Sequence, residues 1–83
     1  MACDVYYMPR HIAPDPTLAA VLRSLRLERG ATQEALAYRS GITTGSLARI
    51  ELGQASPAWA TVREIAVALD VSMVELAAAV EAA

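Results

Sequence analysis

The sequence predicts an all-α fold, a compact bundle of five short helices that follows an extended N-terminal arm. The chain has 83 residues, which suffices for one core, and it is 55% hydrophobic, too apolar for a disordered chain. Alanine supplies 18 residues and phenylalanine none, a composition that favours helices over strands. Signals that begin and end helices divide residues 15–83 into five segments.

The first helix is predicted to begin at Asp15-Pro16. An aspartate there accepts hydrogen bonds from the first free N–H groups, and proline fits the first helical position. Apolar residues then recur at three- and four-residue spacing, at Leu18, Val21, Leu22 and Leu25. Gly30 is expected to end this helix, because glycine readily adopts the left-handed conformation found after a helix.

The second and third helices are predicted to be short and close together. Thr32 can cap a helix from Gln33 to about Ser40, which Gly41 ends. Thr43 opens the next helix, which ends near Leu52-Gly53. Two short helices joined by a glycine-containing turn form the helix-turn-helix pattern, although any small bundle must turn a corner somewhere.

The fourth and fifth helices complete the bundle. Ser56-Pro57 repeats the cap-and-proline opening and predicts the start of the fourth helix. Its expected inner stripe is Trp59, Val62, Ile65, Ala66 and Leu69. Ser72 and Glu75 form a capping box that opens the fifth helix. Its apolar positions are Met73, Leu76, Ala77 and Val80.

We therefore divide the chain into an N-terminal arm, residues 1–14, and a single domain, residues 15–83. The net charge is −2, but it is unevenly distributed. Residues 17–56 carry five arginines and three acidic residues, whereas the remaining residues carry two arginines and six acidic residues. A positive middle flanked by negative ends suggests that an anionic partner would bind the middle of the chain.

Several classes of protein are excluded by composition. No apolar run approaches the length of a membrane span, and the N-terminus does not resemble a secretory signal, so we expect a cytoplasmic protein without membrane contact. Cys3 and His11 are the only residues of their types, which leaves no intrachain disulfide and no Cys/His zinc site. No cofactor or metal is expected. No catalytic set of side chains is apparent, so we expect the protein not to be an enzyme.

From Leu18 to Leu76 the sequence resembles the Cro and phage-repressor type of helix-turn-helix domain, the Xre-like family, which is lambda-repressor-like in fold. The segments that carry the resemblance are Leu22–Arg26, Gly30–Ala37, Gly41–Thr43, Leu47–Glu51, Gly53, Pro57, Thr61-Val62, Ile65–Leu69 and Val71–Leu76. The resemblance implies a DNA-binding domain whose recognition helix is Thr43–Glu51.

The resemblance also implies roles for individual residues on DNA. Thr44, Ser46 and Arg49 would read bases, and an arginine can bond guanine bidentately. The start of a helix is an anion site, so Thr32 and Gln33 would contact phosphate. Further phosphate contacts are expected from Arg39, Thr43 and Gln54. The alternatives are an unpartnered helix start for Gln33 and a surface salt bridge for Arg49.

Two further sets of residues are assigned structural roles by the resemblance. Arg26 and Glu51 match a pair that is buried and salt-bridged in many family members, and arginine suits bidentate pairing with a carboxylate. The fifth helix has apolar residues on more than one face, which predicts an interface. The residues expected there, in a homodimer that the N-terminal arm could cover, are Met73, Val74, Ala77 and Val80.

The expected function is that of a sequence-specific transcriptional regulator, either a repressor or a small autoregulatory controller. It would bind a palindromic operator in double-stranded DNA as a homodimer. Two departures from the family pattern weaken single half-sites: Gly45 replaces a side chain that commonly reads a base, and residues 52–56 carry no charge. The uncharged loop favours the alternative, an antitoxin or adaptor that binds a protein, such as a toxin, through its acidic C-terminal half. The intact segment Thr43–Glu51 favours the regulator.

Overall fold

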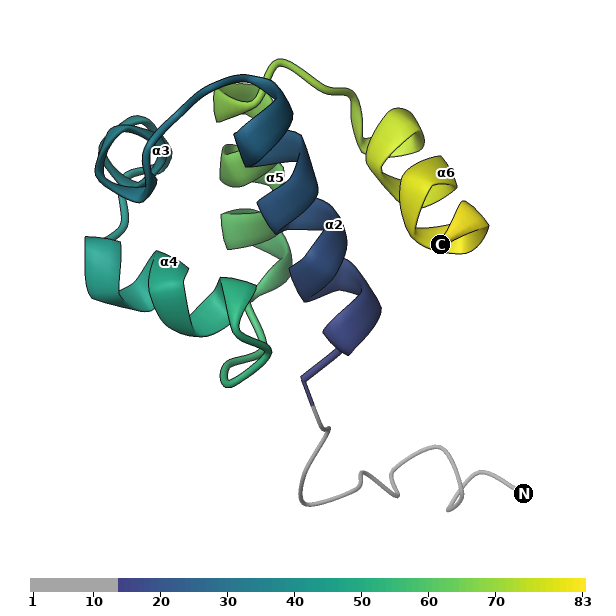
Figure 1. The fold of residues 1–83 in the computed structure, drawn as a ribbon, viewed down its shortest axis with the longest axis horizontal. Helices are drawn as coiled ribbons and strands as arrows, with labels where there is room; N and C mark the ends of the chain where they lie inside the picture. Colours follow the sequence, from purple (N-terminus) through teal and green to yellow (C-terminus); the bar gives the residue numbers. More distant parts are fainter. Residues whose placement is uncertain (1–13) are drawn as a thin grey trace, which may run out of the picture.

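The computed structural model describes residues 14–83 and folds them into five helices (Figure 1). These are α2 (Pro16–Glu28), α3 (Gln33–Ser40), α4 (Thr44–Glu51), α5 (Trp59–Ala68) and α6 (Met73–Ala82). No strand is present within residues 14–83. The predicted all-α bundle is therefore confirmed. The predicted arm lies outside the described residues, except for Pro14.

The helices pack so that the helix-turn-helix and the last helix are on opposite sides of the bundle. α3 packs against both α4 and α5, and α2 packs against α4. α6 packs mainly against α2 and α5. In Figure 1, α3 and α4 accordingly lie at one side of the molecule and α6 lies at the other.

The core draws one fully buried large side chain from each of the first four helices and one from the residue that follows α5. Fully buried are Leu22, Leu36, Leu47, Ile65 and Leu69. α6 contributes a single buried residue, Leu76. Since burial of apolar area supplies most of the stabilisation, α6 is the least firmly docked helix of the five.

The predicted helix starts are confirmed at four of the five helices. Asp15 accepts the N–H of Thr17 at 2.9 Å, and Thr32 and Thr43 each cap their helices through Oγ1 at 3.0 Å. The capping box of α6 is complete, and the backbone N–H of Ser72 donates to Glu75 at 2.8 Å. That hydrogen bond holds the pKa of the Glu75 carboxyl below its usual range.

The prediction for the start of α5 is wrong in two respects. The helix begins at Trp59 behind Ala58, which offers no side-chain cap, rather than at Ser56-Pro57. The backbone of Ala58 is extended, with φ −66° and ψ 156°, so the helix cannot include Pro57, which lines a groove between helices. Trp59, expected in the core, is 69% exposed, because its turn of α5 borders that groove and no other helix of residues 14–83 covers it.

Asp70 follows α5 with a φ of 60°, in the left-handed region that side chains other than glycine adopt at a cost. Replacing Asp70 with glycine should raise the free energy of unfolding by about 0.5–1 kcal/mol, because glycine removes this strain at a position after a helix. Urea melts would measure the change. Asp70→Ala is the control and should be destabilising; a glycine variant as unstable as the alanine variant would contradict the prediction.

Candidate nucleic-acid interface

The turn between α3 and α4 is closed by glycine and by backbone hydrogen bonds. Gly41 follows α3 with a φ of 74°, a conformation that glycine adopts without steric cost. Its N–H donates to the carbonyl of Tyr38 at 3.2 Å, and that of Ile42 donates to the carbonyl of Ala37 at 3.1 Å. Residues 41–43 thus join two helices in direct contact, the geometry of a helix-turn-helix.

The first turn of α4 is arranged by a pair of hydroxyl groups. Thr43 Oγ1 accepts the backbone N–H of Ser46 at 3.0 Å and donates to Ser46 Oγ at 2.9 Å. Both hydroxyls therefore have partners within the protein, and Ser46 is half-buried. Thr44 and Gly45 are exposed between them. Thr44 is thus the more accessible of the two small polar side chains predicted to read bases.

Arg49 lies in the last turn of α4 and is exposed. The two ion pairs formed within residues 14–83 involve other arginines, so the Arg49 guanidinium is not committed to a carboxylate there. The alternative of a surface salt bridge is therefore not realised in the part of the chain that is described. The group keeps its donors available for an external acceptor.

The start of α3 presents a more constrained arrangement than the sequence suggests. Thr32 caps the helix through the N–H of Ala35 at 3.0 Å and is exposed. Gln33 is half-buried, and its Nε2 donates to Glu51 Oε1 at 3.0 Å. An amide nitrogen has two hydrogens, so one remains free for an acceptor outside the protein. The sequence analysis missed this contact, because the residues are far apart in the chain.

A buried cluster around Glu51 joins three of the helices. Arg26 Nε donates to Glu51 Oε2 at 2.8 Å, and Arg26 Nη2 donates to Oε1 at 3.0 Å, the bidentate pairing expected from the resemblance. Arg26 Nη1 also donates to the carbonyl of Ala31 at 2.9 Å. The side chains are only 10% and 1% exposed. Hydrogen bonding to Glu51 raises the pKa of Arg26 above its usual value, so the guanidinium stays charged.

The consequence of this cluster is that α4 is fixed relative to the start of α3. Glu51 is the last residue of α4, Arg26 belongs to α2, and Gln33 is the first residue of α3. A charged hydrogen bond in a buried site is strong and directional. The exposed residues of α4 and the start of α3 are therefore presented by one rigid unit.

The remaining residues predicted to contact phosphate are at the surface. Arg39 is exposed in the last turn of α3. Gln54 is exposed after α4, and its backbone N–H donates to the carbonyl of Arg49 at 2.8 Å. The preceding Leu52 is 69% exposed. The loop therefore offers polar and apolar surface but no charge.

The four residues predicted to form an interface on α6 differ in their exposure. Val74 is 79% exposed and Ala77 is exposed, whereas Met73 and Val80 are half-buried. Met73, Ala77 and Val80 line the groove that α6 forms with α2 and α5. Val74 lies outside that groove. The structure thus places the predicted residues on two adjoining surfaces rather than one.

Another arginine has a structural role that the sequence analysis missed. Arg29 Nε donates to the carbonyl of Leu69 at 2.6 Å, which ties the end of α2 to the end of α5. A basic residue at the end of a helix, such as Arg29, can donate to free carbonyl groups there. The sequence does not indicate, however, that the ends of α2 and α5 lie close together. Arg29 is therefore partly committed within the protein, unlike Arg49.

Residues 14–83 contain no group of three His, Cys, Asp or Glu side chains that could hold a metal ion. None of the helices in this range is both long and apolar enough to span a bilayer.

Comparison with known proteins agrees with this geometry. The helix-turn-helix domain family matches residues 17–79. A relative from Sinorhizobium fredii, the uncharacterized HTH-type transcriptional regulator y4dJ, is 46% identical over 52 residues, which cover 63% of this chain and 68% of that protein.

Solved structures of regulators are similar in fold. The wild-type restriction-modification controller protein C.Esp1396I is 29% identical, with a TM-score of 0.75 over 78% of this chain and 83% of that one. The controller protein C.AhdI from Aeromonas hydrophila is 33% identical, with a TM-score of 0.71 over 74% and 92%. The clp gene regulator ClgR from Corynebacterium glutamicum is 26% identical, with a TM-score of 0.79 over 89% and 78%.

These comparisons give the antitoxin or adaptor alternative no support. The family is one of DNA-binding regulators and is not an enzyme family. The family match over residues 17–79 includes the turn at residues 41–43, the Arg26–Glu51 pair and the exposed residues of α4. The chain belongs to the helix-turn-helix domain family of DNA-binding transcriptional regulators.

Proposed function

We propose that the protein regulates transcription by binding a two-fold symmetric operator as a homodimer, with α4 in the major groove. The observation that carries this proposal is the rigid attachment of α4, whose exposed Thr44 and uncommitted Arg49 are held by the buried Glu51 cluster. A helix of this kind reads base edges, and a dimer reads two half-sites one helical turn apart. Residues 15–83 would form the DNA-binding domain, with α6 as its dimerisation helix.

Each side chain has a distinct part in this proposal. Arg49 would donate to a guanine, and Thr44 would contact a neighbouring base edge. Ser46 and Thr32 each accept a hydrogen bond within the protein and keep their own hydroxyl hydrogen for a DNA acceptor. Thr43 already donates its hydroxyl hydrogen to Ser46 and would have to turn it toward DNA to contact a phosphate. Gln33, Arg39 and Gln54 would hold the phosphates on either side.

The controller proteins favour one type of regulation. C.AhdI and C.Esp1396I, both restriction-modification controller proteins, match the fold of this chain over 74% and 78% of its length. We infer that this protein is likewise a small controller that acts on its own promoter. A gel-shift titration with DNA from upstream of its own gene, against a scrambled duplex of equal length, tests this. Equal affinity for the two duplexes would refute it.

Arg49→Ala should reduce discrimination between operator and random DNA by about 1–3 kcal/mol per half-site, because a bidentate contact to a base is lost. The fold should be unchanged, since Arg49 is exposed and makes no ion pair within residues 14–83. The measurement is the ratio of the two dissociation constants. Arg63→Ala on α5 removes the same charge from an exposed site and is the matched control. If both variants lose discrimination equally, Arg49 does not read bases.

Gln33→Ala should weaken binding to operator and random DNA by the same factor, because phosphate contacts carry no direct sequence information. Its cost to stability should be about 1 kcal/mol, since only one hydrogen bond to Glu51 is lost. Glu34→Ala is the control at the next residue and should have the opposite effect on DNA, because it removes a negative charge from the start of α3. A loss confined to the operator would contradict the phosphate role of Gln33.

A further inference from the structure

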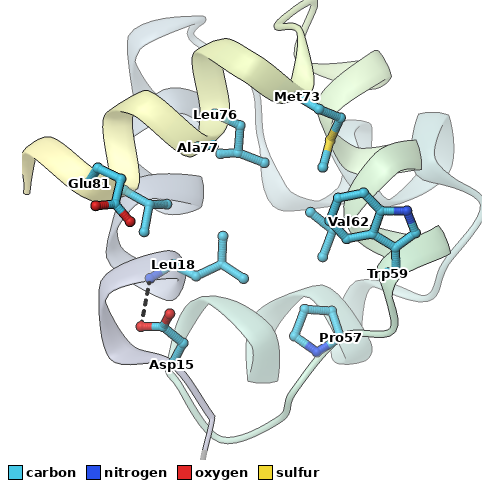
Figure 2. A pocket seen from close by; sticks show the side chains of 10 residues that line it. Asp15, Leu18, Pro57, Trp59, Val62, Met73, Leu76, Ala77 and Glu81 are labelled. Carbon is cyan, nitrogen blue, oxygen red and sulfur yellow. Dashed lines mark hydrogen bonds between the residues drawn. The ribbon is translucent and has the colours of Figure 1, made fainter.

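A groove between α2, α5 and α6 is lined mostly by apolar side chains, and no residue of the described structure fills it. Its volume is about 380 Å³ (Figure 2). The floor is formed by Leu18 of α2, Val62 of α5 and Leu76 of α6. Trp59 stands at its edge with 69% of its surface exposed. An indole left this open beside an apolar groove is typical of a surface that something covers.

The edge of the groove at the start of α2 is acidic. Asp15 and Glu81 both line it, and both carboxylates are visible at the same end of Figure 2. Neither takes part in the ion pairs formed within residues 14–83. An occupant that is apolar along most of its length and positively charged at one end would therefore match the groove.

The chain itself supplies such a segment. Val5-Tyr6-Tyr7-Met8 is apolar and aromatic, and Arg10 and His11 follow it. This stretch ends a few residues before Asp15, which forms part of the groove wall. The connection from Met8 to Pro14 can span roughly 20 Å when extended, which suffices to return the apolar stretch across the groove. Attachment at the groove edge also gives the segment a high effective concentration there.

We propose that residues 5–8 of each chain bind the groove of the same chain, with Arg10 beside Asp15 and Glu81. The segment then covers Trp59, Met73 and Val80. Val74 lies outside the groove, so this occupancy leaves it free for contact with a second copy. The arm and the dimer therefore divide the surface of α6 between them. This inference does not depend on DNA binding.

Trp59 is the only tryptophan of the chain and reports on the groove directly. In the full-length protein, replacement of Val5, Tyr6, Tyr7 and Met8 by serine should shift the Trp59 emission to the red and increase its quenching by acrylamide. Leu27→Ser is the matched control, because Leu27 is an exposed apolar residue that does not line the groove. It should leave both signals unchanged. The measurements are made without DNA.

A dilution series distinguishes coverage of Trp59 by residues 5–8 of the same chain from coverage of Trp59 by a second copy. The quenching of the unaltered protein is followed from concentrations at which it sediments as a dimer to those at which it is a monomer. Protection of Trp59 that persists in the monomer and is lost in the serine variant supports the proposal. Protection that disappears together with the dimer, or a variant with unchanged emission and quenching, overturns it. The outcome of this fluorescence experiment is independent of the outcome of the DNA-binding experiments.

Discussion

Replacing Arg26 or Glu51 with alanine should lower the free energy of unfolding by about 3–5 kcal/mol for each variant. The side chains are 10% and 1% exposed, so either change leaves a largely buried charge without its partner. Loss of Glu51 also removes the acceptor of the Gln33 amide. Loss of Arg26 leaves the carbonyl of Ala31 without its side-chain donor. Denaturant melts monitored by circular dichroism would measure both losses.

The double variant distinguishes a true pair from two separate losses. With both charges gone, no unpaired ion remains, so the combined loss should be smaller than the sum of the single losses. Glu28→Ala is the surface control, because the Glu28–Arg29 contact is 3.9 Å long and its side chains are 68% and 39% exposed. That substitution should cost less than about 1 kcal/mol. Strictly additive losses for Arg26 and Glu51 would show that the two residues act independently.

The elements that the sequence predicted well are those specified by local chemistry. A cap lies within three residues of the N–H groups that it accepts, so Asp15, Thr32, Thr43 and Ser72 could be identified without knowledge of the fold. The same reasoning predicted the glycine turn before α4.

The errors and omissions all depend on contacts between residues distant in the chain. Periodicity assigned Trp59 to the inner face of its helix, but the face is buried only where another helix covers it. The hydrogen bonds of Gln33 to Glu51 and of Arg29 to Leu69 join residues 18 and 40 positions apart. No local rule specifies such pairs. The Arg26–Glu51 contact was expected only because of the family resemblance, since spacing alone did not indicate it.

Glutamate at Val74 should convert the proposed homodimer into a monomer that binds the operator on the order of 100-fold more weakly, because two linked half-sites then act separately. Val74 is exposed on α6, and a charge buried at a two-fold axis would face its own copy. Only one residue of α6 is buried in the bundle, so the helix has apolar surface available for such a contact. Sedimentation velocity and operator titration would measure the two effects.

The geometry of the operator explains why these two effects should occur together. Half-sites in successive major grooves lie about 34 Å apart, and only a fixed dimer can hold two α4 helices at that separation. α6 is at the opposite side of the bundle from α3 and α4, so a contact there leaves both recognition helices uncovered (Figure 1). Leu27→Glu, which introduces the same charge on α2, should change neither assembly nor affinity. A protein without these substitutions that sediments as a monomer at micromolar concentration, yet binds the operator tightly, would contradict both the interface and the two-fold operator.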